Sequence, residues 1–230
     1  MAKIIFSGVA GVDMRNKLNG SVFSKNRYGS YVRTKVTPVN PQTTAQQAAR
    51  NRLSTNSQAW RGLTEDQRQS WIDAAVNFPF TDIYGNTKIL SGQALYVKLN
   101  NNLNQIGLPS LTDAPAPVAL PAIETLSAAV SVGGDTNTLT FTPTPLPADV
   151  YMVVQATGNV TPGKNFVKNL YRFITYFIPT DVSPQNIDSV YKTIHGNPVE
   201  DQKIFYRVFM VSGITGQAGI PVQTSTIVAA

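Results

Sequence analysis

The stretch Thr138-Leu139-Thr140-Phe141-Thr142 alternates strictly between polar and apolar side chains, and a similar alternation returns at Tyr206–Met210. A period of two places alternate residues on opposite faces of a β-strand, so both stretches are predicted strands with one buried face. Together with the turns between them, such stretches predict seven strands: Leu126–Val132, Asn137–Thr142, Val150–Ala156, Leu170–Ile178, Ser189–Ile194, Lys203–Val211 and Val222–Val228. Seven short strands in roughly a hundred residues favour an all-β, Ig-like or fibronectin-like sandwich.

A proline-rich stretch precedes these strands. Residues 108–122 contain four prolines among alanine, leucine and valine, a composition typical of a semi-extended linker. We therefore place a domain boundary at residues 109–122, before a C-terminal domain at 123–230.

Three helices are predicted upstream of this linker, each with its own start signal. Thr44–Gln47 and Thr64–Gln67 fit the capping box, in which a threonine hydroxyl and a glutamine side chain satisfy amides at a helix start. Ser91 is the expected cap of the third helix, which Gly107 and Pro109 end. These helices are predicted to form a small anchor domain at residues 41–108.

Apolar residues at helical spacing predict the core of the anchor domain, with the two tryptophans meeting in it. Its expected members are Leu53, Trp60, Leu63, Trp71, Leu95 and Leu99. Asn56 interrupts the apolar stripe of the first helix. The third helix carries four asparagines at positions 100, 101, 102 and 104, which leaves two interpretations open: a surface that binds a partner's backbone, or a plain polar face in solvent.

The N-terminal part of the chain is basic and has the pattern of a β-hairpin. The β-forming stretches Ser21–Ser24 and Tyr31–Val36 flank the turn-like sequence Asn26–Gly29. Residues 1–60 hold nine lysines and arginines against one acid, a net charge of +8, whereas the rest of the chain sums to −2. A two-stranded hairpin is marginal in water, and a basic segment attracts acidic partners. We therefore expect residues 1–40 to be a docking arm. Its predicted partner-binding residues are Lys25, Arg27, Tyr28, Tyr31 and Arg33.

The composition excludes several kinds of chemistry. The 230 residues include no cysteine and a single histidine, so a thiolate metal site, a cysteine nucleophile and histidine-based zinc or triad arrangements lack their residues. His195 is expected on the surface at the end of a strand. The adjacent acid pairs at 65–66 and 200–201 are explained by a helix start and a turn. We expect no enzyme activity, no metal and no cofactor, and the absence of a long apolar run predicts no membrane span.

Three groups of residues carry a family resemblance. They are the run Gly20–Arg33, the sequence Asn40-Pro41-Gln42-Thr43 with Gln46, Gln47 and Arg50, and the pairs Trp60-Arg61, Leu63-Thr64 and Gln67-Arg68 followed by Trp71. Across residues 18–107 the chain resembles virion-associated structural proteins of tailed phages, including crAss-like phages of gut Bacteroides hosts, and their prophage relatives. The resemblance implies a multi-copy virion protein, made in the host cytoplasm, whose partners are capsid, fibre or tail proteins.

The residues and the resemblance together predict an α+β multidomain chain. Its expected function is that of a phage structural protein, either a capsid auxiliary or decoration component or a fibre-anchoring component. It would dock through its N-terminal region by strand addition or charge pairing. Two alternatives stay open. One is a tail or head–tail connector component. The other is a nucleic-acid-binding accessory protein, in which the cations Arg15, Lys17, Lys25, Arg27 and Arg33 interleave with the rings of Phe23, Tyr28 and Tyr31.

Overall fold

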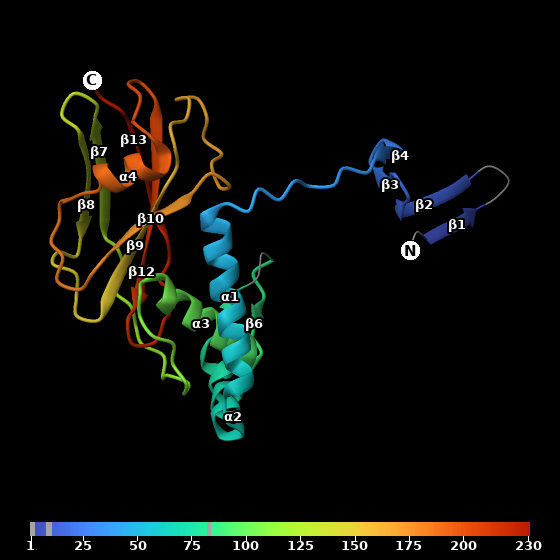
Figure 1. The fold of residues 1–230 in the computed structure, drawn as a ribbon, viewed down its shortest axis with the longest axis horizontal. Helices are drawn as coiled ribbons and strands as arrows, with labels where there is room; N and C mark the ends of the chain where they lie inside the picture. The colour runs from blue at the N-terminus through green and yellow to red at the C-terminus, as the bar shows by residue number, and fades with distance from the viewer. Residues whose placement is uncertain (1–2, 8–10, 82–83) are drawn as a thin grey trace. The chain divides into compact units, whose positions relative to one another are not determined.

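The computed structural model describes residues 3–7, 11–81 and 84–230, and the chain divides into two compact units, Met1–Gln47 and Ala48–Ala230 (Figure 1). Among the described residues it is a mixed α/β protein with N-terminal strands, four helices and several antiparallel sheets. None of the described helices is long and apolar enough to cross a membrane. The predicted domain boundaries at 40, 108 and 122 stay predictions.

The first unit holds a four-stranded antiparallel sheet. Its strands, in sheet order, are β1 (Lys3–Ser7), β2 (Gly11–Leu18), β3 (Ser21–Asn26) and β4 (Gly29–Thr34). The predicted hairpin is confirmed as β3 and β4, which pair from Ser21 with Thr34 to Asn26 with Gly29. The sequence reasoning missed β1 and β2. Asn19 and Gly20 join β2 to β3, and Asn19 has the positive φ of 47° that a tight hairpin turn of this kind requires.

The second unit begins with helices, and the chain passes into it within the first turn of α1 (Thr44–Gly62). The following elements are α2 (Glu65–Ala74), the 3₁₀ turn η1 (Ala75–Asn77), the short strands β5 (Phe80–Thr81) and β6 (Thr87–Lys88), and α3 (Gly92–Gln105). The capping box of α2 is confirmed, and so is the Ser91 cap of α3. The first box lies one residue earlier than predicted, between Thr43 and Gln46.

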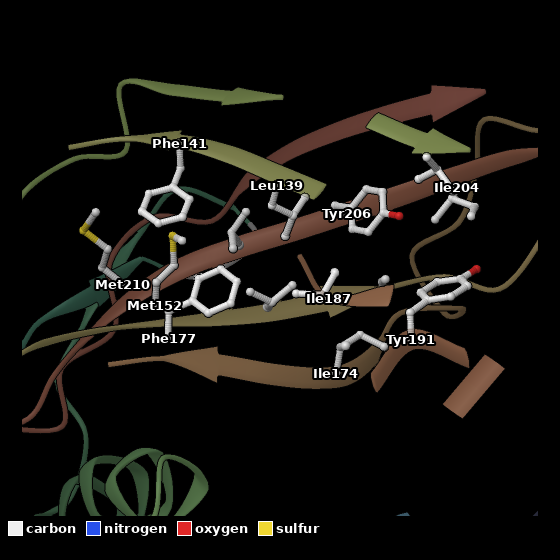
Figure 2. Packing of buried hydrophobic residues seen from close by; sticks show 14 of the residues in the cluster. Leu139, Phe141, Met152, Ile174, Phe177, Ile187, Tyr191, Ile204, Tyr206 and Met210 are labelled. Atoms are coloured by element: carbon white, nitrogen blue, oxygen red, sulfur yellow. The ribbon is translucent and has the colours of Figure 1, made fainter. Parts of the chain in front are cut away.

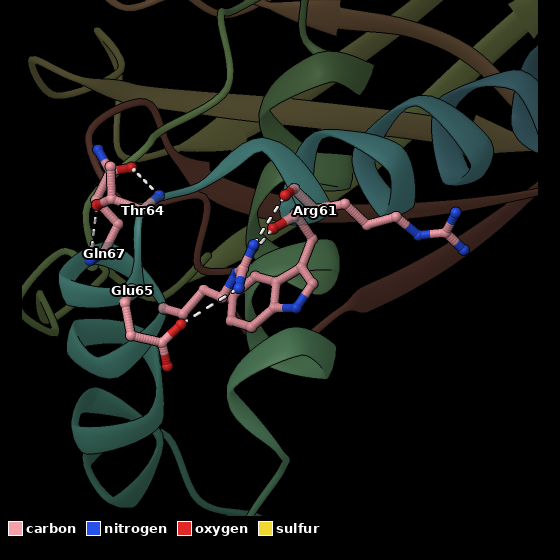
Figure 3. Close-up of polar contacts among 6 residues, drawn as sticks. Arg61, Thr64, Glu65 and Gln67 are labelled. Atoms are coloured by element: carbon pink, nitrogen blue, oxygen red, sulfur yellow. Dashed lines mark hydrogen bonds and ion pairs between the residues drawn. The ribbon is translucent and has the colours of Figure 1, made fainter.

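Arg68 on α2 contacts both sides of the corner between α1 and α2, and Figure 3 labels its two partners, Arg61 and Glu65. The Nη2 of Arg68 donates to the backbone oxygen of Arg61 at 2.8 Å, and its Nη1 lies 3.3 Å from a carboxylate oxygen of Glu65. A cation at the C-terminal end of α1 offsets the partial negative charge of the helix carbonyls. The next helix therefore supplies the basic cap of the previous one.

The helices share a core built around aromatic rings. Trp71 is fully buried, and its indole Nε1 donates to the backbone oxygen of Thr112 at 2.8 Å. Trp60 and Trp71 both pack against the ring of Tyr96, at centroid distances of 5.4 and 5.2 Å, so the predicted meeting of the tryptophans occurs through a tyrosine.

At two positions of α1 the observed burial is the opposite of the predicted burial. Leu53, expected inside, is 54% exposed, whereas Asn56, which interrupts the stripe, is fully buried. The Oδ1 of Asn56 accepts a hydrogen bond from the hydroxyl of Ser110 at 3.3 Å, so the segment after α3 crosses α1 at the asparagine.

Three of the four asparagines of α3, at positions 100, 102 and 104, bind backbone of this same chain, which neither open interpretation anticipated. Asn100 forms a paired amide contact with the backbone of Leu111, accepting from its N–H at 2.7 Å and donating to its oxygen at 3.2 Å. Asn102 donates to the backbone oxygen of Gly216 at 2.8 Å. Leu103 and Ile106 are buried together with Val153 and Val211 from the strands that follow. The third helix is therefore packed onto the C-terminal strands.

The C-terminal strands form two antiparallel sheets around one core, here called the two-sheet region (residues 125–228). One sheet has the order β10 (Arg172–Phe177), β9 (Val150–Ala156), β12 (Lys203–Ser212) and β13 (Val222–Ile227), and the other the order β11 (Gln185–Asn186), β8 (Thr136–Thr142) and β7 (Thr125–Ser131). Figure 2 shows side chains from both sheets, such as Leu139 and Tyr206, meeting in the core. After β13, Ala229 bridges in parallel to Ser131 at the end of β7.

One predicted strand of this region is wrong. Residues 189–194 belong to the helix α4 (Asp188–His195), so the predicted all-β character of residues 123–230 is not confirmed. Ile187, Tyr191 and Ile194 are spaced four and three apart and pack into the core, which is the spacing of a helix face. Asp188 and Lys192, four apart, form an ion pair at 2.7 Å that supports the helix.

Candidate protein-docking surface

The N-terminal sheet has two chemically different faces. Residues directly opposite one another in a ladder share a face, and Lys17 pairs with Val22, which pairs with Arg33. Tyr31 lies two residues from Arg33 and therefore on the same side. We call this side, defined by Lys17, Tyr31 and Arg33, the basic face.

The opposite side of the sheet carries three apolar side chains among polar ones. Phe23 pairs with Val32, and Leu18 pairs with Ser21, two residues from Phe23 on the same strand. Leu18, Phe23 and Val32 define the apolar face. Leu18 is 49% exposed and Val32 is 59% exposed, and Phe23 is only partly buried.

The predicted docking residues divide among three places. Tyr31 and Arg33 lie together on the basic face. Lys25 pairs with Ser30 and lies on the side of the apolar face. Arg27 and Tyr28 form the turn, where the guanidinium lies 4.6 Å from the centre of the Tyr28 ring. The structure therefore brings two of the five predicted residues onto one face, together with Lys17, which was predicted only for the nucleic-acid alternative.

The sheet lacks a core of its own in the residues for which burial is described. Every residue from 16 to 47 is exposed or partly exposed. A sheet normally gains its stability by burying one hydrophobic face against another layer. The apolar face is therefore the kind of surface that a partner protein completes.

The charged side chains of residues 16–47 are all basic. Residues 16–47 hold five lysines and arginines, and no aspartate or glutamate lies between Asp13 and Glu65. Such a segment raises the local concentration of acidic partners and speeds their association, an effect that salt weakens.

Two sequence signals could have identified more of this surface. The dipeptide Asn19-Gly20 is a strong sign of a two-residue hairpin turn and would have predicted β2 beside β3. Once that register is known, the alternation of Leu18 and Phe23 with polar neighbours assigns both to one face.

A second candidate lies in the two-sheet region. A polar pocket of about 340 Å³ is lined by Gly158, Asn159, Asn169, Leu170, Arg172, Ile194 and His195. His195 lies at the end of α4, partly buried rather than on the surface, and its Nε2 is 3.1 Å from the backbone oxygen of Ala156. Burial lowers the pKa of His195, the contact with Ala156 opposes this shift, and the charge of Arg172 adds to it. None of the described lining residues is an acid, so His195 has no carboxylate partner there for acid–base chemistry.

No group of three or more metal-ligating side chains comes together within residues 3–7, 11–81 and 84–230. No protein-family model matches the sequence, and a comparison with curated proteins finds no significant match. The N-terminal sheet therefore remains the stronger candidate, on its own geometry and charge.

Proposed function

We propose that this chain is a structural assembly protein that binds other proteins through its N-terminal sheet. The observation that carries the proposal is the state of residues 16–34, which form strands of a sheet yet bury no side chain. Leu18, Phe23 and Val32 would bury more of their apolar surface against a partner chain. Burying a fully exposed side chain of this kind contributes about 1.5–3 kcal/mol, and these partly exposed side chains would contribute about half of that each. This role requires no catalytic group, metal or cofactor.

We further propose that the assembly is the virion of a tailed phage, in the head as an auxiliary, decoration or fibre-anchoring component, present in many copies. This part rests on the sequence resemblance of residues 18–107 to virion-associated proteins. A tail or connector position is the alternative within the same proposal.

The two-sheet region is proposed to be an Ig-like or fibronectin-like module. Its chain order supports this: two strands (β7, β8) lie in one sheet, the next two (β9, β10) in the other, β11 returns to the first, and β12 and β13 complete the second. Crossing between two packed antiparallel sheets in this way is the Greek-key arrangement of such sandwiches. In the proposed role this module presents a rigid surface to solvent or to further virion proteins.

Purified particles test the proposal. If the source phage is grown and its particles are banded by density, mass spectrometry should find this chain at a fixed ratio to the major capsid protein. Cryo-electron microscopy should then place residues 16–34 against another protein. Absence of the chain from particles, or particles in which these residues contact no protein, would overturn the proposal.

Nucleic-acid binding is a second candidate that one observation favours. Five cations without an acid accompany the exposed rings of Tyr28 (80% exposed) and Tyr31 (42% exposed), a combination that could neutralise phosphates and stack bases. A salt titration with random duplex and single-stranded DNA decides it. Binding through phosphates weakens steeply and linearly in log–log form as salt rises. A chain that elutes with nucleic acid from infected cells and is absent from particles would favour this function.

A further inference from the structure

The outer edge of β4 is open for pairing. β4 is the last strand in the order β1-β2-β3-β4, and its other side faces no strand of the described sheet. The Lys35 amide donates to the backbone oxygen of Gly20, on β3's side, at 2.7 Å. Hydrogen-bonded and non-hydrogen-bonded pairs alternate along an antiparallel ladder. Tyr31 and Arg33 therefore direct their backbone groups toward β3, whereas Ser30, Val32 and Thr34 direct theirs outward.

The edge of β4 is guarded by charge and not by its backbone. Natural proteins protect exposed edges with charged side chains, proline, bulges or short strands, and of these devices the edge of β4 has the cations Arg33 and Lys35, which oppose a second copy but not an acidic segment. β4 is a regular six-residue strand without proline, and the first proline after it is Pro38. An edge left in this condition suits strand addition, in which main-chain hydrogen bonds give affinity and alternate side chains give specificity.

The side chains beside the edge specify what a new strand must carry. Arg33 and Lys35 lie two residues apart on the side of the basic face, where the incoming strand would place carboxylates two residues apart. Val32 lies on the opposite side next to Phe23, where the incoming strand would place an apolar residue. The complementary segment therefore alternates acidic and apolar residues.

We infer that β4 receives, as a fifth strand, an extended segment of a partner protein in which carboxylate and apolar side chains alternate. This inference rests on the proposed assembly function and names the chemistry of its partner. The segment belongs to a different protein, because nowhere in this sequence do two acids stand two residues apart. Pairing of β4 with β4 of a second copy would also bring the cations of Arg33 and Lys35 close to those of the other arm.

A short peptide tests the inference on the full chain. The probe is an acetylated, amidated and fluorescently labelled Thr-Val-Glu-Val-Glu-Val-Thr, measured by fluorescence anisotropy at low salt. Two control peptides separate the contributions: one of the same composition with the two glutamates adjacent, and one N-methylated at its valines. The valines are the residues whose amides would face the outward backbone groups of β4, such as those of Val32 and Thr34. N-methylation of the valines therefore removes the peptide's donors to the ladder and keeps its charge.

The expected result is tighter binding of the alternating peptide than of either control. N-methylation at three positions removes main-chain hydrogen bonds of the ladder and should weaken binding about tenfold or more. Val32→Pro removes an outward amide that β3 does not use and should weaken binding similarly, whereas the matched Val32→Thr variant keeps that amide. Arg33→Glu should weaken binding of the alternating peptide and lessen its dependence on salt.

Equal binding of all three peptides would overturn the inference, because charge alone would then explain the affinity. So would N-methylation without effect, a result that does not depend on whether the Val32→Pro variant folds. The experiments distinguish a failure of this inference from a failure of the proposed function. If particles contain the chain bound through residues 16–34 and the alternating peptide does not bind, only the added strand is refuted.

Discussion

Replacing Gly216 with alanine tests whether α3 and the two-sheet region form one rigid structure. Gly216 follows β12 with a positive φ of 73°, and its backbone oxygen accepts a hydrogen bond from Asn102 on α3. A Cβ at this position would overlap the backbone oxygen of Leu99 and lie 2.9 Å from its carbonyl carbon. The loop and the helix must therefore separate to admit a methyl group.

The cost follows from three contributions. A left-handed conformation costs alanine about 1–2 kcal/mol. Overpacking against a helix backbone adds about 1–3 kcal/mol, and the displaced hydrogen bond from Asn102 about 0.5–1.5 kcal/mol. Alanine also lowers the conformational entropy of the unfolded chain, which reduces the loss of stability by about 0.4–1 kcal/mol. The expected net loss is about 3–5 kcal/mol, concentrated where Leu103 and Ile106 bury their side chains against Val153 and Val211.

Urea unfolding of the full chain measures this loss. Tryptophan fluorescence reports on Trp60 and Trp71 in the helices, whereas far-ultraviolet circular dichroism also reports on the strands. If the contacts between α3 and the strands are lost first, the two methods should show transitions at different urea concentrations. At an m-value of about 2 kcal/mol per molar urea, the midpoint should fall by about 1.5–2.5 M. Gly163→Ala is the matched control, because no atom lies within 4 Å of its added Cβ. Equal midpoints for the Gly216→Ala and Gly163→Ala variants would refute the reasoning.

Three other outcomes are expected. Because Trp71 is buried, Trp71→Ala should lower the free energy of unfolding by about 3–5 kcal/mol. Leu53 is exposed, so Leu53→Ser should lower it by less than about 0.5 kcal/mol. Similar urea midpoints for the two variants would contradict the observed core. Because burial lowers the pKa of His195 in the folded chain, the unfolded chain binds its proton more readily, so stability should fall as pH drops through about 6.5, and less so in a His195→Gln variant. In hydrogen exchange, the amides of β3 and β4 should exchange far faster than those of β9 and β12 in the free protein, and should become protected in particles; equal rates in the free protein would show that the N-terminal sheet is stable alone.

Local patterns predicted most of the regular structure because they act within a few residues. The strand at Val150–Ala156 was predicted with its observed bounds, and the caps at Thr64 and Ser91 are as expected. In each case the deciding interaction joins neighbours in sequence, such as the contact of the Thr64 hydroxyl with the amide of Gln67.

The wrong predictions concern side chains whose burial and hydrogen-bond partners depend on residues distant in the sequence. On α1, the periodicity could not tell that Ser110 reaches Asn56 while Leu53 stays exposed. The asparagines of α3 found backbone partners at Leu111 and Gly216, the second of them 114 residues away from Asn102. Tertiary contacts of this kind override local preference, and no single-sequence pattern contains them.

The residues of the candidate docking surface could be predicted only in part, for a different reason. Lys25, Arg27, Tyr28, Tyr31 and Arg33 were chosen as a basic and aromatic cluster along the chain. Which of them act together depends on the register of the ladder, because a shift of one residue exchanges the two faces. Only the observed register joins Arg33 to Lys17 across β3 and separates both from Lys25.

The charge of the N-terminal sheet and its lack of buried side chains both bear on how the sheet avoids pairing with other copies before assembly. An uncovered apolar face with an open strand edge invites pairing between copies before assembly. A segment with five cations and no acid repels its own copies at short range and associates fastest with an acidic surface. The free energy that the sheet lacks alone, because no side chain from 16 to 47 is buried, would then be supplied on docking. Ordering and binding would therefore be coupled. Substitutions on the apolar face should change assembly far more than they change the stability of the second unit.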